Sequence, residues 1–234
     1  MNINGKTKII GIIGNPVEHS ASPIMHNTIL QQLGLNYVYI PLPTKRTEVH
    51  QALTAIKTFN FSGINVTIPF KEQVIPFLDQ LDPLANKIGA VNTIINKAGK
   101  LIGYNTDGTG FVYALTKDYK YDLTNKSVAI LGSGGSAKSI SFALLEQKIK
   151  KLIVINRTLK NAQVLADSLR AESQVPIETK DFKVQDVTQA LSQADLIINT
   201  TPLGMTPEIH LQPLDNYSWI KKSHLCCDTI YNPL

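Results

Sequence analysis

One stretch of sequence decides the fold of the second half of the chain: Ser127-Val128-Ala129-Ile130-Leu131-Gly132-Ser133-Gly134-Gly135-Ser136-Ala137. An apolar run of this kind is typical of a buried strand, and the glycine-rich turn after it opens a stretch with helical periodicity. Gly132 permits a tight turn, Gly134 lets a phosphate approach the backbone, and Ala137 lets the helix pack closely on the sheet. Because helix N-termini attract phosphates, residues 132–137 predict a dinucleotide site, with a ligand-free turn as the alternative.

Strands and helices continue to alternate through the second half of the chain. Strands are predicted at 128–131, 152–155, near 177, at 196–199 and at 225–230, and helices at 137–147, 159–169 and 187–192. Repeated strand–helix units are typical of a parallel sheet covered on both faces. The second half is therefore predicted to be a Rossmann-type, doubly wound parallel-sheet domain.

The residues after the second strand of this domain indicate which dinucleotide is bound. A site for NAD would place Asp or Glu there to accept the ribose hydroxyls. This chain has Asn156-Arg157-Thr158 instead, followed by Lys160. A carboxylate would repel a ribose 2′-phosphate, whereas the planar guanidinium of Arg157 can bind it through two hydrogen bonds. The sequence thus favours NADP(H) as the cofactor, and a solvated arginine at a strand end is the alternative.

The first half alternates less regularly and predicts a mixed α/β sheet. Strands are expected at 8–13, 37–42, 64–68, 91–96 and 101–104, the last two as a hairpin, and helices at 22–33, 47–59, after Asp82-Pro83, and at 108–118. Ser22 is predicted as the N-cap of the first helix, with Pro23 at its first position, and Pro69 as the residue that stops the third strand. The predicted domains are 1–107 for substrate and 108–234 for the dinucleotide.

Polar side chains gather at strand ends and turns of the first half. They are Ser20, Ser22, Asn65, Thr67, Lys71, Asn92 and Asp107. Individually, Ser22 and Asp107 could be helix caps and Asn92 a turn residue. Together they offer hydroxyls beside a helix start for a carboxylate, and a lysine that can exchange a proton when paired with a carboxylate. An anionic, hydroxylated small molecule is the predicted substrate.

The composition excludes several classes of protein. The 234 residues include 23 Lys+Arg and 18 Asp+Glu, a formal net charge of +5, with 43% hydrophobic residues, which is typical of a globular chain rather than a disordered or fibrous one. The basic residues are dispersed, so nucleic acid is not an expected partner. No secretory signal and no run of about 20 apolar residues is found, so no membrane association is expected and a cytoplasmic protein is predicted.

No metal site is predicted either. Cys226 and Cys227 are adjacent, a spacing that suits neither a zinc site nor a disulfide framework. His26 falls inside the first predicted helix, where packing or hydrogen bonding is the favoured role over metal ligation.

Several motifs of the chain resemble those of the shikimate dehydrogenases, and the resemblance covers nearly the whole chain. The motifs lie at 14–27, 65–71, 89–93, 103–108, 132–137, 156–158, 199–205 and 228–233. The resemblance implies NADPH-dependent reduction of 3-dehydroshikimate to shikimate by a monomer or homodimer. It implies that Lys71 is the catalytic lysine, with Asp107 as its partner. Substrate would be bound by Ser20, Ser22, Asn65, Thr67, Asn92 and these two residues, and the cofactor by residues 132–137, Asn156, Arg157, Thr158, Lys160, Thr200, Thr201 and Met205.

The chain departs from the family pattern at two places. Some members carry a second basic residue where this chain has Asn161, and members continue past the last strand into helices with a glutamine that also contacts substrate. The chain ends at Leu234, before that segment. The missing segment makes a non-catalytic NADP- or shikimate-binding module one alternative. The other is a catabolic quinate/shikimate dehydrogenase, an enzyme that often uses NAD, against which Arg157 argues.

Overall fold

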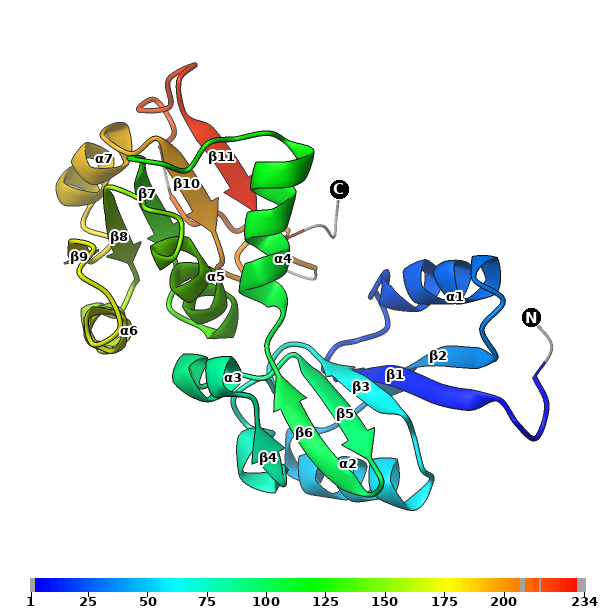
Figure 1. Cartoon of the computed structure of the whole chain (residues 1–234). Helices are drawn as coiled ribbons and strands as arrows, with labels where there is room; N and C mark the ends of the chain where they lie inside the picture. The colour runs from blue at the N-terminus through cyan, green and yellow to red at the C-terminus, as the bar shows by residue number, and fades with distance from the viewer. Residues whose placement is uncertain (1–2, 207–208, 215, 231–234) are drawn as a thin grey trace. The chain divides into compact units, whose positions relative to one another are not determined.

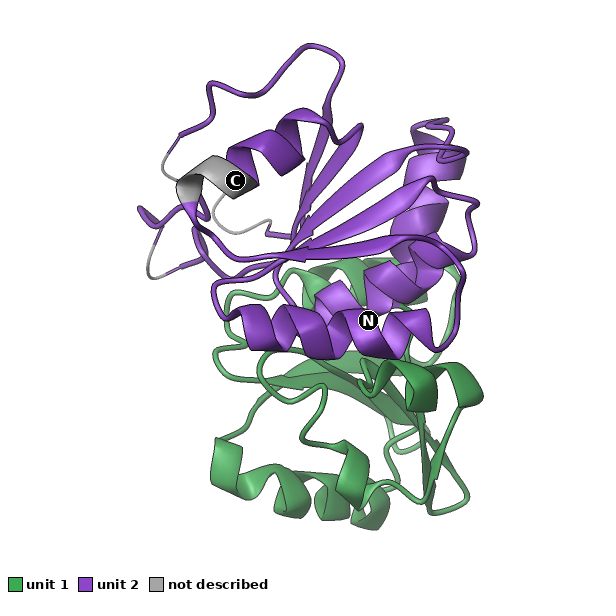
Figure 2. Ribbon diagram, turned by 90° about the vertical axis from the view of Figure 1, so that its left-hand side faces the viewer, with its two compact units in different colours: residues 1–106 green, residues 107–234 purple. Residues whose placement is uncertain are grey.

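The chain forms two compact units, and each is described by itself. A computed structural model describes residues 3–206, 209–214 and 216–230. The units span Met1–Thr106 and Asp107–Leu234 (Figure 2). The sequence places the boundary after Asp107, one residue later.

Unit 1 is built on a mixed six-stranded sheet in the order β2-β1-β3-β5-β6-β4 (Figure 1). Its elements are β1 (Lys8–Gly14), α1 (Ser22–Gln32), β2 (Tyr37–Pro43), a 3₁₀ turn (Arg46–Glu48), α2 (Val49–Thr58), β3 (Gly63–Val66), a second 3₁₀ turn (Ile75–Phe77), β4 (Gln80–Leu81), α3 (Pro83–Ile88), β5 (Thr93–Lys97) and β6 (Lys100–Tyr104). Strand β1 pairs in parallel with β2 and β3, whereas β5 runs antiparallel to both β3 and β6. The predicted mixed α/β sheet is confirmed.

Helices α1 and α2 cover opposite faces of this sheet. Side chains alternate between the faces along a strand, so Ile13 and Ile64 join the core under α2, whereas Ile12 joins a smaller core with Tyr39 and Leu30 of α1. Asn65 and Thr67 alternate with Ile64 and Val66, which belong to the core under α2. Asn65 therefore lies on the α1 face, where it contacts the Tyr39 hydroxyl.

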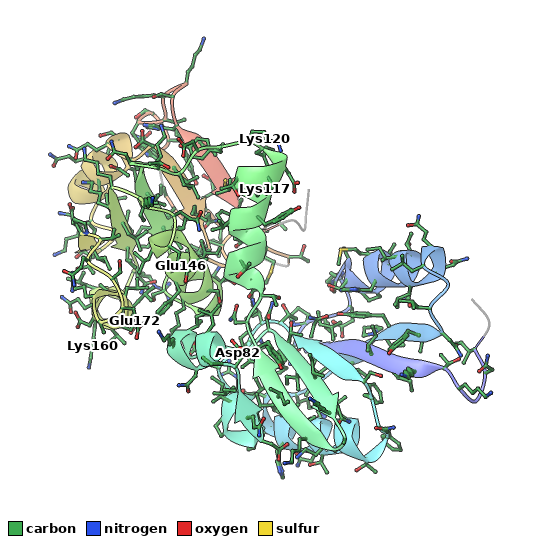
Figure 3. All side chains as sticks on the ribbon, in the orientation of Figure 1. Asp82, Lys117, Lys120, Glu146, Lys160 and Glu172 are labelled. Atoms are coloured by element: carbon green, nitrogen blue, oxygen red, sulfur yellow. The ribbon has the colours of Figure 1, made fainter. Side chains whose placement is uncertain are left out.

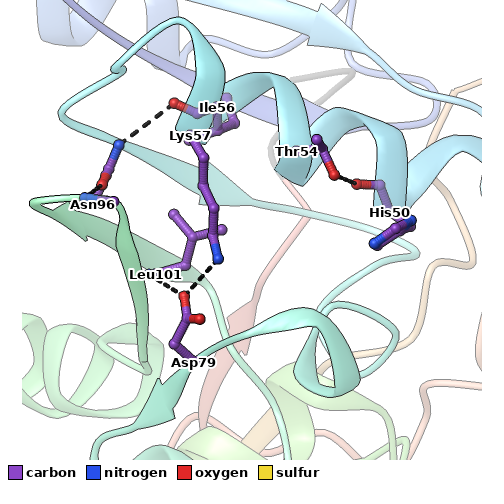
Figure 4. Close-up of polar contacts among 8 residues, drawn as sticks. His50, Thr54, Ile56, Lys57, Asp79, Asn96 and Leu101 are labelled. Atoms are coloured by element: carbon purple, nitrogen blue, oxygen red, sulfur yellow. Dashed lines mark hydrogen bonds and ion pairs between the residues drawn. The ribbon is translucent and has the colours of Figure 1, made fainter.

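An ion pair fastens α2 to the far edge of the sheet (Figure 4). Lys57 Nζ lies 2.8 Å from Asp79 Oδ2, and the same oxygen accepts a 2.6 Å hydrogen bond from the Leu101 N–H of β6. The hydrogen bond from Lys57, followed by that from Leu101, lowers the pKa of Asp79 below its usual value. Because both groups are partly exposed, we expect the pair to fix geometry more than it adds stability.

Unit 2 contains a five-stranded, all-parallel sheet in the order β11-β10-β7-β8-β9. Its elements are α4 (Asp107–Tyr113), a π-helical turn (Ala114–Asp118), β7 (Ser127–Leu131), α5 (Gly135–Leu145), β8 (Lys151–Ile155), α6 (Leu159–Arg170), β9 (Ile177–Lys180), α7 (Val184–Ser192), β10 (Leu196–Asn199) and β11 (Leu225–Asp228). Helix α7 and Trp219 pack on the side chains of Ala129, Leu131, Ile153, Ile155 and Ile197. Helices α5 and α6 contact β7, β8 and β9 and each other. The predicted doubly wound parallel sheet is confirmed.

Several expected boundaries differ from the structure, including those of α5, at 135–145 rather than 137–147, and α7, which begins at Val184 rather than 187. Strand β3 ends at Val66 rather than 68, although Thr67 N–H still donates to Ile13 O, and β11 ends at Asp228 rather than 230. Asn92 lies just before β5, not inside it. The predicted helix at 108–118 begins as α4 and continues as a π-helical turn.

The predicted N-cap of α1 is also wrong. Ala21 occupies the cap position without a side-chain hydrogen bond, and the Ser20 hydroxyl accepts from Ser22 N–H instead. A serine bonding two residues onward resembles a short side-chain turn, which competes with helix capping. At α3, by contrast, Asp82 caps the helix through Leu84 N–H, as predicted.

Within the described residues, no helix has both the length and the apolar character that crossing a bilayer requires.

A glycine allows α4 and α5 to pack closely. A Cβ at Gly108 would overlap the backbone carbonyl of Ser139 and lie 2.9 Å from the Ala143 Cβ. Gly110, in the same helix, has open space where its Cβ would be. The two glycines of α4 therefore play different roles.

We expect Gly108→Ala to lower the unfolding free energy of unit 2 by about 1–3 kcal/mol, because α4 must move away from α5. Gly110→Ala should be neutral or raise it by about 0.5–1 kcal/mol, because alanine favours helix without a clash. Urea unfolding followed by the fluorescence of Trp219, the single tryptophan, measures both. Equal effects of the two substitutions would contradict the close packing.

Candidate functional site

The predicted substrate residues of unit 1 lie along one edge of its sheet, formed by the carboxyl ends of β1 and β3. Strands β1 and β3 end there and the antiparallel β5 begins there, since Asn65 pairs with Thr93. The loop carrying Ser20 follows β1, and Thr67 and Lys71 follow β3. From β1 the chain continues to β2 on one side of the sheet, whereas from β3 it continues to strands on the other side, and such a switch point is where open α/β sheets bind ligands.

The Asn65 amide is held at three points. Its Oδ1 accepts a 2.8 Å hydrogen bond from the Tyr39 hydroxyl, and its Nδ2 donates to Asn92 O at 3.3 Å and to Thr93 Oγ1 at 3.2 Å. Tyr39 is itself fixed: its ring stacks on His26 at 4.4 Å, and its backbone N–H and C=O both bond the Asn27 amide. Burial lowers the pKa of His26 below its usual value.

Asn92 is buried and joins the hairpin to the end of unit 1. Its Oδ1 accepts from Thr106 N–H at 2.9 Å and from the Thr93 hydroxyl at 3.0 Å, and its Nδ2 donates to Thr106 Oγ1 at 2.9 Å. Asp107 follows Thr106 directly, as the first residue of α4. The network therefore reaches to the last residue before the predicted catalytic aspartate.

Lys71 lies in the turn after β3 and is partly buried. Its backbone carbonyl accepts a 2.7 Å hydrogen bond from Val91 N–H, so its main chain is fixed to the residue before Asn92. Thr67 packs close to Gly14, where a Cβ would overlap its methyl group. Ser20 and Ser22 stand at the start of α1, the former accepting a 3.2 Å hydrogen bond from the backbone of the latter.

The glycine-rich turn of unit 2 has the geometry expected of a phosphate-binding turn. Gly132 has φ +110°, which favours glycine, and a Cβ there would lie 2.6 Å from Thr200 Oγ1. Gly134 is the N-cap of α5 and has open space at its Cβ position. The first N–H groups of a helix lack partners within it, so residues 132–137 form a cradle that fits a pyrophosphate.

The end of β8 carries basic and neutral polar groups. Asn156 Nδ2 donates to Thr158 O at 3.0 Å, and Arg157 and Thr158 are exposed. Lys160 projects outward from the first turn of α6 (Figure 3). The Asn156 N–H donates to Lys180 O at the end of β9, which brings a further lysine beside this turn. Lys180 was not predicted, because the pairing of β8 with β9 is not visible in the sequence. These residues fit a ribose 2′-phosphate.

Asn199 organises the loop of Thr200, Thr201 and Met205. It is buried, its Oδ1 accepts from Thr201 N–H and Oγ1, and its Nδ2 donates to Asp228 Oδ2 at 3.1 Å. Thr200 Oγ1 donates to Leu131 O at 2.6 Å, directly before Gly132, and Met205 N–H donates to Pro202 O. The predicted motif at 228–233 is described only to Ile230; Tyr231, Asn232 and Pro233 lie outside the described residues.

A doubly wound nucleotide-type unit joined to a mixed-sheet unit with a polar switch-point edge defines a two-unit α/β dehydrogenase. Residues 12–94 match the family model described as shikimate dehydrogenase substrate binding domain, and residues 114–214 match that described as shikimate / quinate 5-dehydrogenase. The chain belongs to the shikimate dehydrogenase family.

Individual relatives agree with this membership. The NADP(+) shikimate dehydrogenase of Desulforamulus reducens is 42% identical over 231 residues, covering 99% of this chain and 79% of the relative. A crystal structure of a shikimate dehydrogenase in complex with NADP+ aligns with TM-score 0.90 and 38% identity over 100% of this chain and 80% of that one. The Thermus thermophilus shikimate 5-dehydrogenase in complex with NADP(H) and shikimate aligns with TM-score 0.84 and 31% identity, over 97% and 80%.

We expect Asn199→Asp to lower the unfolding free energy of unit 2 by about 1–3 kcal/mol, because it sets a second carboxylate against Asp228 in a buried position. Adding Asp228→Asn should recover most of that loss by restoring a donor and an acceptor in exchanged positions. Urea unfolding followed by Trp219 fluorescence measures both variants. A double variant no more stable than Asn199→Asp alone would contradict the proposed link between β10 and β11.

Proposed function

We propose that this chain is an NADP-dependent shikimate dehydrogenase, which reversibly reduces 3-dehydroshikimate to shikimate. The observation that carries the proposal is the pair of side-chain amides, Asn65 and Asn92, each held by hydrogen bonds at the switch-point edge of unit 1. Neutral amides and hydroxyls with one lysine suit a hydroxylated carboxylate. We further propose a monomer or homodimer that acts in the cytoplasm and takes small molecules rather than nucleic acid or membrane as partners.

The substrate would be bound by residues of the polar edge. Ser20 and Ser22, at the start of α1, are proposed to hold the carboxylate, because helix N-termini and hydroxyls favour anions. Asn65, Thr67, Asn92 and Asp107 are proposed to hold ring hydroxyls. The hydrogen bonds that fix the two amides before any ligand arrives support this role, since pre-ordered groups lose less entropy on binding.

Lys71 is proposed to hold and transfer the proton of the reacting hydroxyl, with Asp107 favouring its charged form. Bound NADPH supplies the hydride for reduction of the ketone. Ala137 and the glycines of residues 132–137 would hold its pyrophosphate with Ser133 and Ser136. Asn156, Arg157, Thr158 and Lys160 would hold the ribose phosphate, and Thr200, Thr201 and Met205 would line the nicotinamide end.

The direct test is an assay for shikimate-dependent reduction of NADP+, compared with quinate as substrate and with NAD+ as cofactor. Preference for shikimate and NADP+ supports the proposal. Preference for quinate and NAD+ would establish a catabolic enzyme instead. Binding of NADP+ and shikimate by calorimetry without turnover would establish a non-catalytic binding module.

We expect Lys71→Ala to lower kcat by roughly 10²–10⁴-fold, because general acid–base groups contribute about that much. The Kd for NADP+ should stay within about twofold, because the glycine-rich turn is unchanged. Lys97→Ala removes an exposed lysine at the opposite end of β5 and is the matched control. Turnover by Lys71→Ala equal to that of the control would overturn the proton-transfer role.

Arg157→Ala should raise the Kd for NADP+ by roughly 10- to 100-fold, because a charge-assisted, two-point hydrogen bond to a phosphate contributes about 1.5–3 kcal/mol. The Kd for NAD+, which lacks the 2′-phosphate, is the internal control and should not rise. Calorimetry on both cofactors measures the difference. A parallel loss of NADP+ and NAD+ affinity would show that Arg157 acts on structure rather than on the phosphate.

A further inference from the structure

We propose that Thr93 is a positioning residue that links two side-chain amides, Asn65 and Asn92, and holds them in place at the substrate edge. The Thr93 hydroxyl joins the side-chain amides of Asn65 and Asn92. The inference rests on the proposed function, and it assigns a task to a residue outside the proposed substrate-binding set.

The orientation of Asn65 follows from a backbone carbonyl. Asn65 Nδ2 lies 3.3 Å from Asn92 O, which can only accept a hydrogen bond. The nitrogen must therefore face this carbonyl, and Oδ1 must face the Tyr39 hydroxyl at 2.8 Å. Tyr39 is consequently the donor in that contact.

The orientation of Asn92 follows from a backbone N–H. Thr106 N–H can only donate, and it lies 2.9 Å from Asn92 Oδ1. Asn92 Nδ2 is thereby turned to Thr106 Oγ1, also at 2.9 Å. A main-chain group thus determines the orientation of each amide.

Thr93 joins these two fixed amides. Its hydroxyl faces a donor, Asn65 Nδ2 at 3.2 Å, and an acceptor, Asn92 Oδ1 at 3.0 Å. It must accept from the first and donate to the second, and among side chains of this size only a Ser or Thr hydroxyl does both well. The result is a series of side-chain hydrogen bonds donated in one direction from Tyr39 through Asn65 and Thr93 to Asn92, whose Oδ1 also accepts from the N–H and hydroxyl of Thr106.

This direction determines what Asn65 offers to a ligand. Both hydrogens of its Nδ2 point at Asn92 O and Thr93 Oγ1, whereas the carbonyl-type Oδ1 has two lone pairs and one contact. Asn65 therefore presents an acceptor, and the ligand group opposite it is a donor. A hydroxyl can donate to Asn65 and a ketone cannot. Asn65 therefore recognises a substrate hydroxyl that keeps its hydrogen throughout the reaction.

The test compares two substitutions of Thr93 with a control. Thr93→Val keeps the shape but removes both hydrogen bonds, and should raise the KM for shikimate by roughly 5- to 50-fold with a smaller change in kcat. Thr93→Ser keeps the hydroxyl and should stay within about threefold of the wild type in KM. Thr58→Val removes a hydroxyl that bonds within α2, at Thr54 O, and should leave KM unchanged.

Two further measurements keep the outcomes distinct. Tyr39→Phe removes the hydroxyl that donates to Asn65 Oδ1 and should also raise the KM for shikimate. This variant tests the network even where Thr93→Val folds poorly. The ¹⁵N resonances of the Asn65 and Asn92 side-chain amides, assigned by Asn→Asp substitution, should shift in Thr93→Val and not in Thr93→Ser, with no ligand present.

A wild-type chain that neither binds nor oxidises shikimate would overturn the proposed function, and the amide resonances would still test Thr93. An active wild type with unchanged KM in Thr93→Val would overturn the positioning role. So would equal damage by Thr93→Ser and Thr93→Val, or amide resonances that Thr93→Val leaves unmoved.

Discussion

The polar edge of unit 1 depends on one acceptor, the backbone carbonyl of Asn92. It accepts a 2.8 Å hydrogen bond from the N–H of Val66, the last residue of β3, and a second hydrogen bond from Asn65 Nδ2. The same atom thus joins two segments of chain and orients a side chain between them. Because unmade hydrogen bonds of partly buried groups are costly, Asn65 has one orientation rather than two.

In unit 2, a glycine turn and a buried amide hold the corresponding edge. Gly132 N–H donates to Ile155 O of β8, and Thr200, after β10, donates to Leu131 O of β7. Asn199 then links β10 to β11 through Asp228. Four neighbouring parallel strands therefore fix the positions of the loops that follow them, and the open space at Gly134 remains where a phosphate fits.

Most of the fold could be predicted because its signals are local. The run 128–131 and its glycines predict β7 to within one residue and α5 to within two at each end, and Asp82-Pro83 predicts the cap of α3. Thr93, Tyr39 and Lys180 could not be identified this way, since each acts through a partner far along the chain. Tyr39 reaches Asn65 across 26 residues, a contact set by strand order rather than by any spacing in the sequence. Ser22 is not the cap, because the helix already includes Ser22 as its first residue and the Ser22 N–H donates to the Ser20 hydroxyl.

Neutral hydrogen bonds suit this edge better than charges would. A carboxylate at position 65 would lack the donors that Asn92 O and Thr93 Oγ1 require, and a lysine would lack the acceptor that Tyr39 requires. Only an amide supplies both, and an amide changes neither charge nor orientation with pH. The proposed role of Asn65 is to recognise a hydroxyl while a proton is transferred nearby. That role requires the amide to keep its own hydrogens in place, and the hydrogen bonds from Tyr39 to Thr106 hold them there.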